Sequence, residues 1–189
     1  MNEILEKLLK ILNDALKIVF VGIGEEKLAD DGVGPYVISE LLHLSNEKFL
    51  FINAGIDLMS RIDEIVDFKA THLVLLDTCT LNKPPGTVAI IERENIKEYV
   101  PISSHTIPIH VVIDLLLERL LGLNVFMIGF VPESIEGFTD LKLYKENEIS
   151  LEERNENIDL PFFELHLTET IQKAANRIIN LIKEIMQKI

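Results

Sequence analysis

Acidic residues crowd a short loop near the start of the chain. The stretch VGIGEEKLADDGVG, residues 21–34, holds Glu25 and Glu26 and then the pair Asp30-Asp31. It follows an apolar run and precedes a helical pattern, a position at which α/β proteins often bind a phosphate. Four carboxylates would oppose a phosphate, and the glycine spacing does not match the G-x-G-x-x-G pattern of dinucleotide-binding loops. The loop is therefore expected to bind a cation and not a nucleotide.

The two aspartates of this loop need not have the same role. The simplest role for Asp30-Asp31 is to cap the next helix, because Asp accepts hydrogen bonds from the free N–H groups of a first turn. One cap requires only one Asp. We assign Asp30 to the cap or to a supporting contact, which leaves Asp31 available for chemistry.

A third carboxylate and a histidine extend the candidate site. Asp77 ends the apolar run THLVLLDTCT, and ligands of open α/β sheets bind just outside the carboxyl ends of the strands. Asp31 and Asp77 are therefore expected to meet across one cleft. His105 lies in the loop PISSHTIPIH, although a lone His is more often a surface or hydrogen-bonded residue. Two carboxylates and one imidazole would make a site for a divalent transition metal with positions open to water or substrate.

The remaining histidines and the cysteine carry weaker signals. Cys79 is the single cysteine, which excludes an internal disulfide and a multi-cysteine zinc site. No base lies near Cys79 in the sequence, so we expect a small buried residue and not a nucleophile. The other histidines are expected at the surfaces of helices or strands: His43, His72, His110 and His166.

Length and charge narrow the classes of protein. With 189 residues the chain is expected to form one domain, residues 1–189. Its net charge of −13 repels nucleic acid and anionic membrane surfaces and favours basic segments of partner proteins. No apolar run approaches the ~20 residues of a membrane helix. A cytoplasmic protein without a membrane-inserted segment is expected.

Apolar periodicity predicts an alternation of strands and helices. This order is typical of a three-layer α/β/α sandwich around a mostly parallel, mixed five-stranded sheet. The turn NKPPG is expected to make the fourth strand antiparallel to its neighbour. The expected helices span 2–14, 34–44, 57–68, 110–122 and 164–188, and the expected strands span 16–24, 48–55, 71–80, 87–92 and 123–133.

One segment fits neither pattern. Residues 139–163 are polar and acidic, and a loop of that length is uncommon in a compact domain. The segment either contains a strand near Lys142–Tyr144 or acts as a lid. Because it follows a strand whose carboxyl end faces the expected cleft, we expect it to border the cleft and to influence the choice of partner.

Three motifs in order resemble those of a known family. GIGEEKLADDGVGPYV, LVLLDT and SSHTIPI, with their spacing, are similar to those of the hydrogenase maturation endopeptidases. The resemblance implies a peptide-bond hydrolase, of the aspartic type, that removes the C-terminal extension of a [NiFe]-hydrogenase large-subunit precursor. It also implies that nickel, carried by the precursor, is the metal that the acidic cleft senses. A monomer is expected.

The resemblance also assigns residues. The family's metal-contacting positions fall on Asp31, Asp77 and His105, which are expected to serve as both metal-binding and catalytic residues. Glu25, Asp30 and Gly55 are the expected substrate-binding or supporting positions. The family usually has Asn after its second glycine, where this chain has Glu25. That difference leaves open an alternative, a non-catalytic metal-binding chaperone or inactive homologue that binds the precursor.

Overall fold

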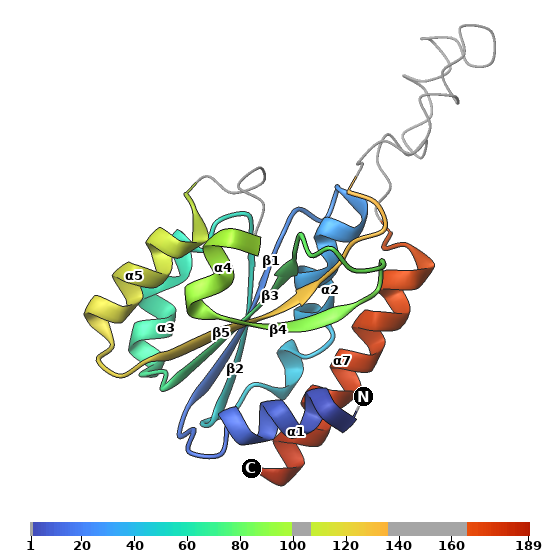
Figure 1. Cartoon of the computed structure of the whole chain (residues 1–189). Helices are drawn as coiled ribbons and strands as arrows, with labels where there is room; N and C mark the ends of the chain where they lie inside the picture. Colours follow the sequence, from blue (N-terminus) through green and yellow to red (C-terminus); the bar gives the residue numbers. More distant parts are fainter. Residues whose placement is uncertain (1, 100–106, 136–165) are drawn as a thin grey trace, which may run out of the picture.

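A five-stranded mixed sheet forms the centre of the molecule (Figure 1). The computed structural model describes residues 2–99, 107–135 and 166–189. The strand order is β2-β1-β3-β5-β4, with β4 antiparallel to β5 and the other neighbours parallel. The strands are β1 (Ile18–Ile23), β2 (Phe49–Gly55), β3 (His72–Thr78), β4 (Val88–Glu92) and β5 (Asn124–Phe130).

Helices cover both faces of this sheet. One face carries α1 (Asn2–Ile11), α2 (Val33–Ser39) and α7 (Glu169–Lys188), and the other carries α3 (Ile62–Phe68), α4 (Arg93–Tyr99) and α5 (Ile109–Arg119) (Figure 1). Short 3₁₀ turns precede or follow them: η1 (Ala29–Gly32), η2 (Leu42–Leu44) and η3 (Met59–Arg61). No helix among residues 2–99, 107–135 and 166–189 is both long and apolar enough to cross a membrane.

The central strands are buried on both sides, which explains their nearly continuous apolar sequence. In β1 every residue is buried, and alternate side chains enter two different cores. Phe20 packs with α1, α2 and α7, whereas Val19 and Val21 pack with α3 and α5. The three-layer α/β/α prediction is thereby confirmed, including the antiparallel strand after the Pro-Gly turn.

Two glycines let α2 lie directly against the sheet. A methyl group on Gly34 would overlap main-chain atoms of Ile23 and Leu76, and one on Gly22 would overlap the carbonyl of Gly34. These contacts are closer than any side chain allows, so both positions require glycine. The first turn of α2 is thus pressed onto β1 and β3, and the acidic loop that precedes it is held above the ends of those strands.

Several predicted elements differ from the structure in extent. The helix predicted over 34–44 ends at Ser39 and gives way to η2, a 3₁₀ turn of the kind common at helix ends. α4 was not predicted, because its sequence RENIKEY has only one fully buried side chain, Ile96, and no apolar stripe. The predicted segment 139–163 lies outside the described residues.

The prediction that His72 lies at the surface is wrong. The residue is only 4% exposed, at the start of β3. Nδ1 lies 3.2 Å from the hydroxyl of Thr71, and Nε2 lies 3.4 Å from the Asn124 amide and 3.6 Å from the carboxylate of the exposed Asp14. Burial lowers the pKa of His72, and the negative charge of Asp14 offsets only part of that effect.

The lowered pKa of His72 predicts acid sensitivity at this end of the sheet. Below the ordinary value of 6.5 the unfolded chain binds a proton that the folded chain resists, so stability falls as pH drops. The contribution is fully present above that pH and changes by at most about 1.4 kcal/mol per pH unit. Urea unfolding of the unsubstituted chain and of His72→Gln measures this contribution. The pH values are 5.5 and 7.5, chosen about one unit on either side of the ordinary value.

We expect His72→Gln to lose less stability between the two pH values than the unsubstituted chain. The same substitution at the exposed His43 is the matched control and should leave the pH dependence unchanged. Equal slopes for His72→Gln and the unsubstituted chain would contradict the assignment.

Candidate active site

Polar residues are buried at one edge of the sheet. In the part of the chain that the structure describes, five polar or charged residues are buried, and only His72 lies at the amino edge. The other four lie at or just beyond the carboxyl ends of β1 and β3: Asp30, Asp31, Asp77 and Thr78. Burying a carboxylate is costly unless hydrogen bonds compensate it, so such a cluster requires an explanation.

The cluster lies where the direction of the chain through the sheet changes. From β1 the chain crosses to β2 on one side, and β3 then pairs with β1 on the other. The parallel register pairs Gly22 with Leu76, which brings the ends of β1 and β3 together. A ligand crevice of an open α/β sheet forms at such a switch point. The loop carrying Asp31 leaves β1, and Asp77 is the penultimate residue of β3.

Asp31 points toward β3. Its Oδ1 accepts a hydrogen bond from the Thr78 hydroxyl at 3.2 Å, and its Oδ2 accepts one from the main-chain N–H of Glu25 at 2.8 Å. The side chain is 7% exposed, so it lies just beneath the surface. A carboxylate in this position is shielded from bulk water but can still be reached by a ligand.

Asp77 shares a partner with Asp31. Its Oδ1 accepts the main-chain N–H of Thr78 at 2.6 Å and lies 3.4 Å from the Thr78 hydroxyl. The two carboxylates therefore lie on either side of one hydroxyl group. The predicted approach of Asp31 and Asp77 across the ends of the strands is confirmed.

The glycines of the loop are needed for this arrangement. Gly24 has a φ of +133°, and a side chain there would overlap the carbonyl oxygen of Asp31. Its N–H donates to the carbonyl of Gly55 at 3.0 Å, and Gly55 itself has a φ of +52°. Both glycines thus hold conformations that L side chains rarely adopt. Gly55 supports the loop from the end of β2.

The glutamates of the loop are bound locally. The Glu25 carboxylate accepts from the N–H of Lys27 at 3.2 Å, and that of Glu26 accepts from the Asn53 amide at 3.1 Å. Only the main chain of Glu25 contacts Asp31 in the hydrogen bonds described above. That contact is available to any residue at position 25 except proline.

Asp30 does not cap the helix that follows it. Neither η1 nor α2 has a side-chain cap, and the Asp30 carboxylate turns away from both N-termini. It accepts hydrogen bonds from the N–H groups of Glu133 and Ser134, both at 2.9 Å, and from the N–H and hydroxyl of Thr168 at 2.7 and 3.1 Å. The predicted cap is wrong, and the alternative of a supporting contact is confirmed.

Asp30 therefore joins three segments that are distant in the sequence. It links η1 to the chain leaving β5 and to Thr168, whose hydroxyl in turn accepts from the N–H of Ile171 and caps α7. Its side chain has no exposed surface. Hydrogen bonds to a buried carboxylate are the strong kind, because the acceptor is charged. Consecutive aspartates thus point in two directions, one toward the scaffold and one toward the cleft.

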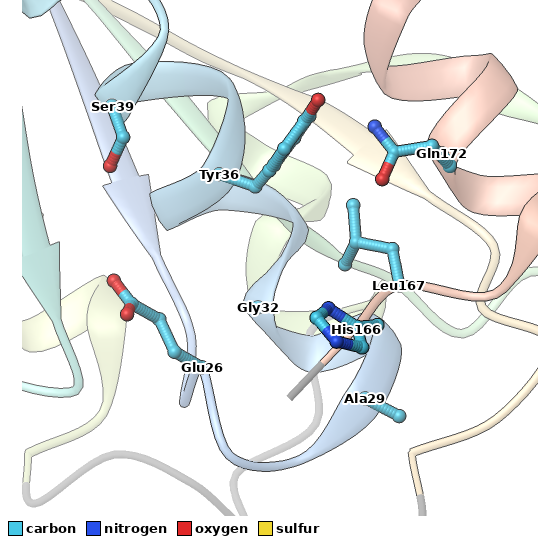
Figure 2. Close-up of a pocket in the computed structure, with 8 residues that line it drawn as sticks. All are labelled: Glu26, Ala29, Gly32, Tyr36, Ser39, His166, Leu167 and Gln172. Carbon is cyan, nitrogen blue, oxygen red and sulfur yellow. The ribbon is translucent and has the colours of Figure 1, made fainter. Parts of the chain in front are cut away.

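A hollow of about 190 Å³ borders the same loop (Figure 2). Figure 2 shows it between the loop, α2 and the start of α7. Asp31 and Asp77 do not line it, although Gly32 lies next to Asp31 in the sequence. Its volume is below the roughly 300–1,000 Å³ of most small-molecule sites. The lining residues are Glu26, Ala29, Gly32, Tyr36, Ser39, His166, Leu167 and Gln172.

The predicted metal site is described only in part. His105 lies outside the described residues, and within residues 2–99, 107–135 and 166–189 no group of three His, Cys, Asp or Glu side chains is arranged to hold a metal. Asp31 and Asp77 supply two carboxylate groups that meet at the Thr78 hydroxyl. Two oxygen ligands with one imidazole would fit a divalent transition metal, so the donor set is chemically suitable.

Cys79 is buried, as predicted. It is 1% exposed, and its sulfur packs where Gly129 leaves room for it on the neighbouring strand. Burial, followed by the negative charge of Asp77, raises the pKa of the Cys79 thiol to about 12. The thiolate is the nucleophilic form, so this residue is unsuited to nucleophilic catalysis at neutral pH.

Sequence reasoning did not identify Thr78 or Thr168 as parts of the site. Both contact the aspartates through hydroxyl groups, and threonine at the end of a strand or before a helix is too common to indicate function. The position of Thr78 directly after Asp77 is the one available signal. Thr168 would have been recognisable only as a helix cap.

We call the hydrogen bonds that the Asp30 carboxylate accepts from Glu133, Ser134 and Thr168 the Asp30 clamp. This clamp predicts a large loss of stability in Asp30→Asn. An Asn side chain has one acceptor oxygen, and its NH₂ group would face N–H donors that now bind a carboxylate. We expect the free energy of unfolding to fall by about 3 kcal/mol, against about 1 kcal/mol or less for Asp31→Asn. Guanidinium unfolding of the two variants measures the difference.

Asp31→Asn is the matched control because it makes the same change one residue away. It also removes a charge beside Asp77, which relieves repulsion in the unliganded cleft. Equal losses in the two variants would show that Asp30 is not a clamp.

The raised pKa of Cys79 predicts a protected thiol. At pH 8 roughly one folded molecule in ten thousand would carry the thiolate, and burial blocks access to it. Ellman's reagent should leave the native chain unlabelled and label the chain fully in guanidinium. Rapid labelling of the native protein would contradict both the burial and the raised pKa.

The chain is similar in sequence to known hydrogenase maturation proteases. The family model described as hydrogenase maturation protease matches residues 35–158. A putative hydrogenase maturation protease of Methanocaldococcus jannaschii is 30% identical over 139 residues, 69% of this chain and 81% of that protein. The hydrogenase 3 maturation protease of Escherichia coli is 26% identical over 117 residues, 59% of this chain and 75% of that protein.

The fold is also that of a solved member. A crystal structure of a [NiFe] hydrogenase maturation protease from Thermococcus kodakarensis matches with a TM-score of 0.72 and 23% identity, over 96% of this chain and 99% of that one. At this identity the match shows a shared fold. The family model covers more than half of the chain, and the M. jannaschii relative covers more than two thirds of it. The chain therefore belongs to the hydrogenase maturation protease family.

Proposed function

We propose that this protein is a nickel-dependent endopeptidase that removes the C-terminal extension of a [NiFe]-hydrogenase large-subunit precursor. The supporting observation is the pair of buried carboxylates, Asp31 and Asp77, on either side of one hydroxyl at the switch point of the sheet. Two carboxylates held close together away from water repel each other, and a bound cation would offset that repulsion. The nickel belongs to the precursor and is part of the substrate.

Asp31, Asp77 and His105 are the proposed metal-binding and catalytic residues. The carboxylates would bind the nickel of a loaded precursor from one side and so distinguish it from an empty one. A bound divalent metal supplies Lewis-acid polarisation of a carbonyl. A carboxylate within reach of the attacking water can also accept its proton, which is the chemistry of an aspartic-type enzyme.

Direct attack by water is the proposed route of hydrolysis. Cys79, whose thiol is buried and has a raised pKa, is a poor candidate for a covalent intermediate. The supporting roles are assigned to Gly55 and Glu25, through the main chain, and to Asp30, through the clamp on Thr168. These residues position the loop and do not touch the peptide bond.

The partner is a protein with a basic, extended segment. A net charge of −13 attracts such a segment and repels nucleic acid. We propose that the enzyme acts as a cytoplasmic monomer, since the acidic pair lies within one chain and requires no second copy. The hollow beside Glu26 and Tyr36 offers room for a side chain of the precursor.

The alternative of a non-catalytic chaperone rested on Glu25 in place of the family's Asn. The hydrogen bond from position 25 to Asp31 comes from the main chain, and the Glu25 carboxylate turns to the N–H of Lys27. The substitution therefore leaves the support of Asp31 intact. We accordingly favour the enzyme.

Processing of nickel-loaded precursor by single-residue variants tests the proposal. Asp31→Asn, Asp77→Asn and His105→Ala should each abolish release of the C-terminal peptide, measured as the change in precursor mass. Asp67→Asn makes the same chemical change on the exposed side of α3 and should process normally. Each site variant should stay folded, and for Asp31→Asn the stability should change by about 1 kcal/mol or less.

Two results would overturn the proposal. If the unsubstituted chain binds loaded precursor in a stable complex and leaves its mass unchanged, the protein is a chaperone. If His105→Ala processes precursor at the normal rate, the three residues do not share one site.

A further inference from the structure

The Thr78 side chain connects the two carboxylates of the proposed site. Its hydroxyl lies 3.2 Å from Oδ1 of Asp31 and 3.4 Å from Oδ1 of Asp77. Its main-chain N–H also donates to Oδ1 of Asp77, at 2.6 Å. One residue thus contacts both carboxylates, which lie more than forty positions apart in the sequence.

The fold does not require a hydroxyl group at position 78. β3 is buried along its whole length, and Thr78 itself is 3% exposed. Valine has nearly the same shape and an equal preference for strands, and it avoids the cost of burying a hydroxyl group. The hydroxyl is compensated by the carboxylates, so its function should be found in its effect on them.

A hydroxyl carries one hydrogen and can donate it to one acceptor at a time. Placed between two carboxylates, it can donate to either and reduces the repulsion between them. Asp31 is held from its other side by the N–H of Glu25, which fixes the direction of its second oxygen. The Asp31 carboxylate accepts two hydrogen bonds among about four lone-pair sites, so it can also bind a cation.

We propose that Thr78 is a positioning residue that holds Asp31 and Asp77 ready to bind one divalent cation. This inference rests on the proposed function and adds a residue to it. Without the hydroxyl the two carboxylates would turn apart, and cation binding would have to bring them back against their repulsion. Preorganised ligands avoid that cost, and partners of metal ligands commonly change metal affinity by 10–100-fold when removed.

Calorimetric titration of the full chain with aqueous Ni²⁺ tests the role of Thr78. We expect Thr78→Val to weaken Ni²⁺ binding by about 10–100-fold and Thr78→Ser, which keeps the hydroxyl, to stay within about threefold. The kcat/KM for nickel-loaded precursor should fall in Thr78→Val and recover in Thr78→Ser. A role in folding alone would move the melting temperature and leave the Ni²⁺ affinity of the folded protein unchanged.

Thr71→Val is the matched control. Thr71 precedes the same strand at its opposite end, where its hydroxyl accepts from the N–H groups of Leu16 and Lys17. Its loss should lower stability and leave Ni²⁺ affinity unchanged. If Thr78→Val and Thr71→Val lose the same stability, only Thr78→Val should also lose Ni²⁺ affinity.

The outcomes separate this inference from the proposed function. Equal Ni²⁺ affinity in Thr78→Val and the unsubstituted chain, with normal processing, overturns the role of Thr78 and leaves the function standing. No Ni²⁺ binding by the unsubstituted chain also overturns it, because no cation site would then exist for Thr78 to shape. In either case the processing assay on the unsubstituted chain decides the function independently.

Discussion

The arrangement of the site depends on the hydrogen bonds that the buried carboxylate of Asp30 accepts. It accepts from Glu133, Ser134 and Thr168 and so fixes η1 against the chain leaving β5 and the start of α7. With Asp30 directed inward, the next residue is directed outward over the ends of β1 and β3. The geometry of Asp31 therefore depends on the charge of Asp30, whose described hydrogen-bond partners all belong to the scaffold. A neutral side chain at position 30 would leave several N–H groups without an acceptor, which is why a carboxylate is tolerated at full burial.

Close packing at glycine completes the constraint. Gly34 presses α2 onto β1 and β3, and Gly24 lets the loop pass beneath the carbonyl of Asp31. Without these contacts the loop would stand farther from β3, and the Thr78 hydroxyl would not reach Asp31. The site is thus built from main-chain positions that only glycine can occupy, together with three aspartates that each have a defined set of donors.

Much of the architecture follows from local sequence, whereas the site follows only in part. The apolar runs within β1 and β3 indicate strands buried on both faces, and their alternation with helical patterns indicates a parallel sheet. The same rule places Asp31 and Asp77 at one edge. Local pattern could not separate the role of Asp30 from that of a cap, because its donors lie more than 100 positions away. Nor could it identify His72 as buried, since the contacts around its ring include Asn124 from another strand.

The difference between the three aspartates explains how the same residue type serves both structure and chemistry. Asp30 accepts four hydrogen bonds from protein groups, so its charge is compensated by the scaffold. Asp31 accepts two and lies near the charge of Asp77, so its electrostatic demand is met less completely. Repulsion between two carboxylates at a water-poor edge raises the energy of the free site, and a divalent cation lowers it. The clamp on Asp30 thus fixes the loop in which Asp31 is held close to Asp77, and that closeness would favour the cation binding proposed above.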